Sequence, residues 1–261
     1  MAKVLQVGNR TLAAEELIPL LASYQIVPQL LCESIIDEAI APITCTPEEI
    51  AMACQQFEEH WQLTCEAEKQ AWLNHYGMNQ EQLELLATRK LRIEKFKQVT
   101  WGHKLESYFL KRKSHLDRAI YSLLRTQDKG LANELYFRLS EGEQSFAELA
   151  RQYSQGSEAE TGGLQGPVEF GTLHPHLVEL LYTSQPGQIS PPLPFGEWFV
   201  IVRLEKLLPA QFNEALRQRL LGEFFEAWFQ EQLAQLPHRD KIWMGAASPH
   251  QVNTAVGLAA A

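Results

Sequence analysis

The segment TGGLQGPVEFGTLHPHL, residues 161–177, holds residue types that are often found at chemical sites. It contains four glycines, two prolines and the histidines His174 and His176. Gly162 and Gly163 are not followed by the Lys-Ser/Thr pair of a phosphate-binding loop, so we do not expect a phosphate site. The histidines flank a proline, and in an extended segment they point to opposite sides, which is poor geometry for one metal. We therefore interpret both as solvated loop histidines.

The cysteines are the second group that could bind a metal or form disulfides. All four lie in the first quarter of the chain and none forms a CxxC pair: Cys32, Cys45, Cys54 and Cys65. This pattern favours free, partly buried thiols over a metal site or a disulfide framework. We expect no metal and no cofactor.

Bulk composition excludes several classes of partner. The chain has 261 residues, 45% of them hydrophobic, with a formal net charge of −9. An acidic, globular composition is a poor basis for binding nucleic acid or anionic lipid. No run reaches the roughly 18 to 20 apolar residues of a membrane span, and the first residues lack the apolar core of a signal peptide. We therefore expect a cytoplasmic protein without a membrane span.

Residues 1–115 are predicted to form a mostly helical domain after a small strand near Val4. Apolar residues between 30 and 40 repeat at helical spacing. Thr46, followed by proline and two glutamates, and Asn79, followed three residues later by glutamine, are typical helix starts. The basic run 90–113 is interpreted as a solvated helix face, and a docking surface for acidic partners is the alternative.

Residues 116–208 are predicted to form a small α+β domain. Strands are expected at 119–125 and 198–205, and helices at 128–140, 145–153 and 175–182. A long helix within 209–236 carries an apolar stripe that must be buried, and we expect it to pack on the N-terminal domain. Residues 237–261 show no sustained period and are predicted to be a flexible tail.

Several short motifs of the central region occur together and in order. They are FAELARQYS, GG, FGTLHPHL, PGQIS and WFVIVRLE, between about residues 116 and 208. In sequence and spacing they resemble the parvulin-type (PpiC, rotamase) peptidyl-prolyl isomerases. The flanking helices are similar in layout to the parvulin-linked chaperones of the SurA and PrsA type. The resemblance implies a four-stranded antiparallel sheet wrapped by helices, with no cofactor.

The resemblance also implies site residues, carried over motif by motif. The proline-pocket positions of the family fall at Leu173 and Leu177, and the leucine of its GGDLG motif falls at Gln165. Of the polar positions, one histidine falls at Tyr121, a second at Phe199 or Val200, and a Cys or Asp at Gly156. Tyr121 is therefore the expected catalytic residue. The expected substrate-binding residues are Leu164, Gln165, Phe170, Leu173, Leu177, Phe195, Trp198 and Phe199.

The function implied by the resemblance is isomerisation of X-Pro bonds in unfolded or exported polypeptide. Because the polar positions are replaced, one alternative stays open. In that alternative the chain is a catalytically weak or inactive chaperone or adaptor, which uses the same surface only to bind. The sequence leaves the oligomeric state undetermined.

Overall fold

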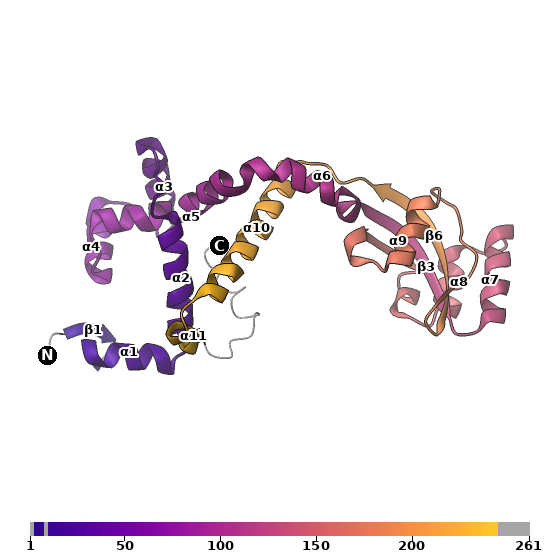
Figure 1. Ribbon diagram of the computed structural model, residues 1–261, viewed down its shortest axis with the longest axis horizontal. Helices are drawn as coiled ribbons and strands as arrows, with labels where there is room; N and C mark the ends of the chain where they lie inside the picture. Colours follow the sequence, from indigo (N-terminus) through magenta and orange to yellow (C-terminus); the bar gives the residue numbers. More distant parts are fainter. Residues whose placement is uncertain (1–2, 8–9, 245–261) are drawn as a thin grey trace. The chain divides into compact units, whose positions relative to one another are not determined.

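The structure is a computed structural model that describes residues 3–7 and 10–244 (Figure 1). The chain forms two compact units, residues 1–105 with 218–261, and residues 106–217. We call them unit 1 and unit 2. The sequence interpretation placed the divisions at 115/116 and 208/209, whereas these units divide at 105/106 and 217/218.

Unit 1 begins with a hairpin and continues with helices. Its hairpin pairs β1 with β2, and the second of these strands was not predicted. The elements are β1 (Lys3–Val7), β2 (Arg10–Ala13), α1 (Ala14–Ser23), α2 (Val27–Ile40), α3 (Pro47–His60), α4 (Glu66–Tyr76) and α5 (Gln80–Trp101). Thr46 and Asn79 cap α3 and α5 with their side chains, as their sequence patterns predict.

The end of the chain returns to unit 1. Helix α10 (Glu214–Gln235) contributes rings that pack against those of α5, with Trp101 stacked on Phe224 at 6.2 Å and Phe96 at 5.2 Å from Trp228. A short helix, α11 (His238–Met244), follows within the predicted tail and contacts α2. The rest of the predicted tail, 245–261, lies outside the described residues.

Unit 2 is built on a four-stranded antiparallel sheet with strand order β4-β3-β6-β5. Its long central strands β3 and β6 pair along nearly their whole length. The elements are α6 (Leu105–Leu116), β3 (Arg118–Thr126), α7 (Lys129–Glu141), α8 (Phe146–Tyr153), β4 (Leu164–Glu169), α9 (Pro175–Thr183), β5 (Leu193–Phe195) and β6 (Trp198–Leu208). The α+β class, with a small sheet domain inserted between helical segments, is confirmed.

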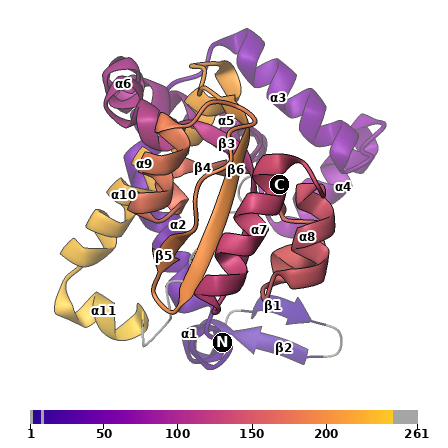
Figure 2. The same cartoon turned by 90° about the vertical axis from the view of Figure 1, so that its right-hand side faces the viewer.

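Helices cover both faces of this sheet, with α7 and α8 on one side and α9 on the other (Figure 2). Successive residues of a strand point to opposite faces. Leu124 and Ile201 therefore join the core beneath α7 and α8, whereas Tyr121 and Val202 join the core beneath α9. The face toward α9 carries the candidate site.

None of the helices in the described part of the chain is long and apolar enough to span a bilayer. All four cysteines are free thiols.

Candidate functional site

A pocket of about 140 Å³ opens on the α9 side of the sheet in unit 2. Its walls come from the two central strands, the short edge strand β5 and helix α9. The lining is almost wholly apolar: Leu123, Arg125, Leu177, Leu180, Leu193, Phe195, Trp198, Val200 and Val202. A dry apolar cavity of about 150 Å³ can hold a benzene ring, so a proline ring fits a space of this size.

Strand alternation explains which side chains reach the pocket. Along β6 the pocket residues are every second residue, Trp198, Val200 and Val202, and along β3 they are Leu123 and Arg125. Residues two apart share a face of a strand, and the β3–β6 register brings the two sets together. The wall is therefore positioned by the most regular part of the sheet.

One side of the pocket carries a charge. The guanidinium of Arg125 lies over the ring of Trp198, 5.2 Å from its centroid. Arg125 Nε is 3.1 Å from Glu158 Oε1, and Glu158 is almost fully buried. The cation is thus held between an aromatic ring and a carboxylate, a geometry in which both contacts are attractive.

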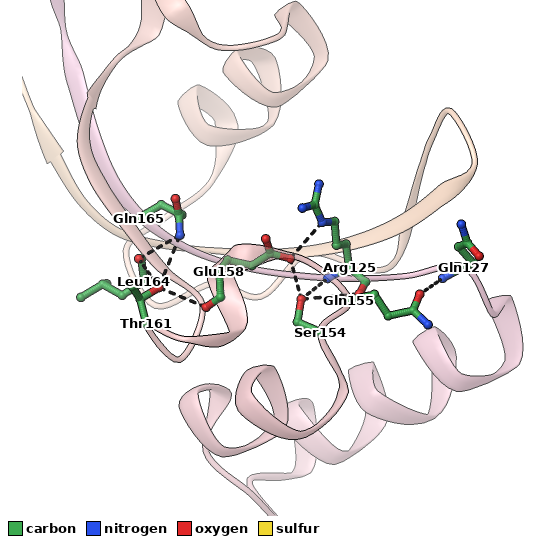
Figure 3. A network of polar contacts seen from close by, with 8 residues as sticks. All are labelled: Arg125, Gln127, Ser154, Gln155, Glu158, Thr161, Leu164 and Gln165. Carbon is green, nitrogen blue, oxygen red and sulfur yellow. Dashed lines mark hydrogen bonds and ion pairs between the residues drawn. The ribbon is translucent and has the colours of Figure 1, made fainter.

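Hydrogen bonds hold this carboxylate in place (Figure 3). Ser154 Oγ donates to Glu158 Oε1 at 2.6 Å and accepts from the backbone N–H of Arg125 at 3.1 Å. The backbone N–H of Gln155 donates to Arg125 O at 3.0 Å. The loop after α8 is therefore joined to the end of β3 through both backbone and side chain.

Gly156 leaves the space that this ion pair fills. A Cβ atom at residue 156 would lie 2.1 Å from Arg125 Nη2 and 2.2 Å from Glu158 Oε2. The Arg125–Glu158 pair therefore occupies the volume that a side chain at residue 156 would need.

Three of the predicted substrate-binding residues line the pocket: Leu177, Phe195 and Trp198. Leu173 is half-buried and packs against the core beneath α9. Phe170 is buried in that core and stacks on Tyr182 at 4.3 Å.

The other predicted binding residues lie elsewhere. Leu164 is exposed at the start of β4, and the Gln165 side chain donates to the Leu164 carbonyl at 3.0 Å. Phe199 follows a pocket residue directly on β6, so alternation directs it to the opposite face.

Tyr121 is buried and belongs to the core beneath α9, on the same strand face as Leu123 and Arg125. It is not among the residues that line the pocket. Burial raises the pKa of its phenol, and the negative charge of Glu158 raises it further. The phenol is therefore neutral at pH 7 and able to donate a hydrogen bond.

His174 and His176 lie beside the pocket without lining it. The His174 imidazole caps α9 by accepting from the His176 backbone N–H at 3.3 Å, and its ring centroid is 4.7 Å from that of Phe195. Within the described residues there is no group of three or more His, Cys, Asp or Glu that could hold a metal ion.

Sequence reasoning missed six lining residues. Four of them are apolar residues on β3, α9 and β6 whose periodicity could have indicated them: Leu123, Leu180, Val200 and Val202. Leu193 lies on a strand too short to be recognised, and nothing in the local sequence pairs Arg125 with Glu158.

Residues 123–206 match the family model described as Rotamase, the PPIC-type PPIASE domain. This segment contains the lining of the pocket and the Arg125–Glu158 pair. The chain carries a parvulin-type isomerase domain.

Curated relatives match part of this chain. A Chaperone SurA of Bordetella avium (strain 197N) is 35% identical over 104 residues, which cover 36% of this chain and 20% of that protein. A Chaperone SurA of Bordetella pertussis (strain Tohama I) is 40% identical over 91 residues, covering 34% of this chain and 17% of that protein. The similarity thus spans about a fifth of the length of these curated relatives.

Solved structures resemble the chain at lower sequence identity than these curated relatives do. The peptidylprolyl isomerase PrsA from Bacillus cereus is 19% identical, covers 93% of this chain and 89% of its own, and has a TM-score of 0.42. The parvulin domain of PpiD from E. coli is 28% identical, covers 38% of this chain and 95% of its own, and has a TM-score of 0.33.

Proposed function

We propose that this chain is a folding factor that isomerises X-Pro peptide bonds in polypeptide segments bound at unit 2. The observation that carries this proposal is the apolar pocket of about 140 Å³ inside the segment that matches the isomerase domain. Unaided X-Pro isomerisation takes tens to hundreds of seconds against a barrier near 20 kcal/mol. A catalyst of this step is useful wherever proline limits folding.

The pocket supplies a physical means of lowering that barrier. The barrier comes from amide resonance, which is lost as the C–N bond twists. Phe195 and Trp198 are paired across the β5–β6 turn and line the pocket together with Leu177 and Leu180 of α9. Proline held against these side chains fixes one end of the amide while the preceding residue rotates. Catalysis follows if the pocket binds the twisted amide more tightly than the planar one.

Exchange NMR and a protease-coupled assay on a Leu-Pro peptide test this proposal. Phe195→Ala and Trp198→Ala remove half-buried rings from the wall, and we expect kcat/KM to fall about tenfold or more, because each ring contributes on the order of 1.5 kcal/mol or more of contact. Phe137→Ala removes an exposed ring from α7, which covers the other face of the sheet, and is the matched control. If folded wild-type protein leaves the isomerisation rate at its uncatalysed value, the proposed turnover is rejected.

We further propose that unit 1 binds unfolded polypeptide through exposed apolar side chains on α3, on α4 and at the residue that follows α3. Met52 is 62% exposed, Trp61 45% and Tyr76 49%. The rings gather, with Trp61 5.6 Å from Trp72 and 6.2 Å from Tyr76. The exposed rings of Trp61 and Tyr76, and separately the exposed Met52, favour contact with apolar segments of a partner.

This second proposal is tested by measuring how well the chain suppresses the aggregation of a chemically denatured client protein. We expect a Met52→Ser, Trp61→Ser double variant to suppress light scattering less than wild type does. Phe137→Ser in unit 2 removes an exposed aromatic residue of similar size and serves as the control. Equal suppression by the double variant and wild type would show that these side chains are not the binding surface.

A cytoplasmic location, expected from the sequence, stays a prediction. Fractionation of cells that produce the protein, followed by detection with an antibody, tests it directly.

A further inference from the structure

The pocket of unit 2 has one charged lining residue, Arg125, among eight apolar ones. Its side chain is 35% exposed, whereas that of its partner Glu158 is 6% exposed. The cation therefore faces the pocket and the solvent, while the carboxylate that balances it lies behind. A ligand in the pocket meets the guanidinium before it meets Glu158.

Three contacts fix the position of this cation. Nε of the guanidinium forms an ion pair with Glu158 at 3.1 Å, the flat guanidinium lies over Trp198, and Glu158 accepts a hydrogen bond from Ser154. An arginine that is already ordered loses little side-chain entropy when it binds a carboxylate. A planar guanidinium also matches the geometry of a carboxylate better than an ammonium does.

Two carboxylates near Arg125 weaken the attraction between its guanidinium and an anionic ligand. Glu158 neutralises part of the Arg125 charge from the buried side. Glu197 lies on the β5–β6 turn, is exposed, and accepts a hydrogen bond from Gln127 Nε2 at 3.3 Å. Both reduce the attraction of an anion, so we expect a moderate preference that depends on the Arg125–Glu158 geometry.

We propose that Arg125 determines specificity by favouring proline segments in which a neighbouring residue carries a carboxylate. This inference rests on the proposed isomerase function, because it names the substrate class of the same pocket. Glutamate beside the proline places its carboxylate within reach of the guanidinium, while the proline ring occupies the apolar space between α9 and Trp198.

Matched peptides measure this preference as a ratio within each protein variant. The peptides are Ala-Glu-Pro-Phe and Ala-Gln-Pro-Phe, and Ala-Ala-Pro-Glu and Ala-Ala-Pro-Gln, all blocked at both ends. Exchange NMR gives kcat/KM for each. For wild type we expect a glutamate-to-glutamine ratio of about fivefold in at least one pair, as for a partly exposed ion pair of about 1 kcal/mol. Added salt should reduce that ratio.

Three variants separate charge from position. Arg125→Gln should reduce the ratio to about one. Glu158→Gln keeps an acceptor for Ser154 but removes the counter-charge, so it should raise the ratio. Gly156→Ala keeps both charges, but its Cβ atom would meet Arg125 Nη2 at 2.1 Å, so the guanidinium must move and the ratio should fall. Phe137→Ala should give the wild-type ratio.

Failure of this inference is distinguishable from failure of the isomerase function. Turnover of every peptide with equal rates for glutamate and glutamine, or an unchanged ratio in Arg125→Gln, overturns the role of Arg125 and leaves the isomerase standing. If no peptide is turned over, the isomerase fails. In that case the glutamate-to-glutamine preference is measured from the Kd values of the same peptides by chemical-shift titration. Equal Kd values for the two peptides, or a preference unchanged in Arg125→Gln, overturn the role of Arg125.

Discussion

Asp117 Oδ1 accepts a hydrogen bond from the backbone N–H of Ala210 at 2.7 Å. Asp117 directly precedes β3 and Ala210 follows β6, so this bond joins the entry of one central strand to the exit of the other. The second carboxylate oxygen accepts from Tyr182 Oη at 3.0 Å, and Lys113 Nζ lies 3.2 Å from Oδ1. One buried carboxylate thus fastens three segments of unit 2.

Replacement of Asp117 should destabilise unit 2 strongly. In Asp117→Ala, the backbone N–H of Ala210 loses its acceptor, whereas the hydroxyl of Tyr182 keeps its hydrogen bond to the Ser114 carbonyl at 2.8 Å. We expect the free energy of unfolding to fall by about 1 to 3 kcal/mol. Asp117→Asn keeps one carbonyl acceptor and should lose less. Urea denaturation measures both, and equal loss in the two variants would contradict this account.

Tyr182 should ionise at unusually high pH. Desolvation, the hydrogen bond to Asp117 and the charge of that carboxylate, in that order, together raise the pKa of its phenol to about 12. Since an unperturbed tyrosine ionises near pH 10, the folded state favours the neutral phenol. The resulting stability is fully present below about pH 10 and is lost as pH rises toward 12.

Absorbance at about 295 nm, compared between wild type and Tyr182→Phe, isolates the ionisation of this phenol. Asp117→Asn removes the negative charge next to the hydroxyl, so it should lower the Tyr182 pKa toward the ordinary value. A Tyr182 pKa that is unchanged by Asp117→Asn would assign the whole shift to desolvation.

Gly163 is predicted to tolerate no side chain. Its φ is +84°, and a Cβ atom there would lie 2.8 Å from the backbone oxygen of Leu123. Gly163 also accepts a hydrogen bond from the Leu123 N–H at 2.8 Å, so neither backbone can easily withdraw. We expect Gly163→Ala to lower the free energy of unfolding by about 3 kcal/mol or more.

Gly187 provides the control for this substitution. Its φ is +85°, but no atom lies within 4 Å of a Cβ built there. Gly187→Ala therefore carries only the conformational cost, about 1 to 2 kcal/mol. Thermal or urea unfolding of the two variants compares them, and similar losses would show that space around Gly163 is not the constraint.

Local signals account for most of the elements that the sequence predicted. Thr46, Asn79 and Ser145 each accept a hydrogen bond from the third residue of their helix, which is why these helix starts could be predicted. Helix α4 was missed because its N-cap is Cys65, a residue without a side-chain cap bond. Strand β4 contains Gly166 and Pro167, and β5 has three residues, so neither shows a strand pattern.

The pocket was predicted only in part, because its walls depend on register. The sequence predicted both Trp198 and Phe199 as binding residues, but neighbouring residues of a strand point to opposite faces, and the packing of α9 shows that Trp198 is the one that faces the pocket. The Arg125–Glu158 pair joins residues 33 positions apart through the loop at Gly156. No short-range pattern encodes that pairing, because it exists only once β3 and the loop after α8 are in place.

The last prediction concerns Tyr121, the residue that the resemblance to the parvulins implies to be catalytic. Its neutral phenol lies on the strand face that carries Leu123 and Arg125, one alternation step from the pocket wall. If the phenol donates a hydrogen bond to the twisting amide, Tyr121→Phe should lower kcat about tenfold at unchanged KM, as expected for a bond of about 1.4 kcal/mol made in the transition state. Exchange NMR on a Leu-Pro peptide measures both constants. Because phenylalanine keeps the buried ring, an unchanged kcat would show that Tyr121 serves only the core, and that the apolar walls alone perform the isomerisation.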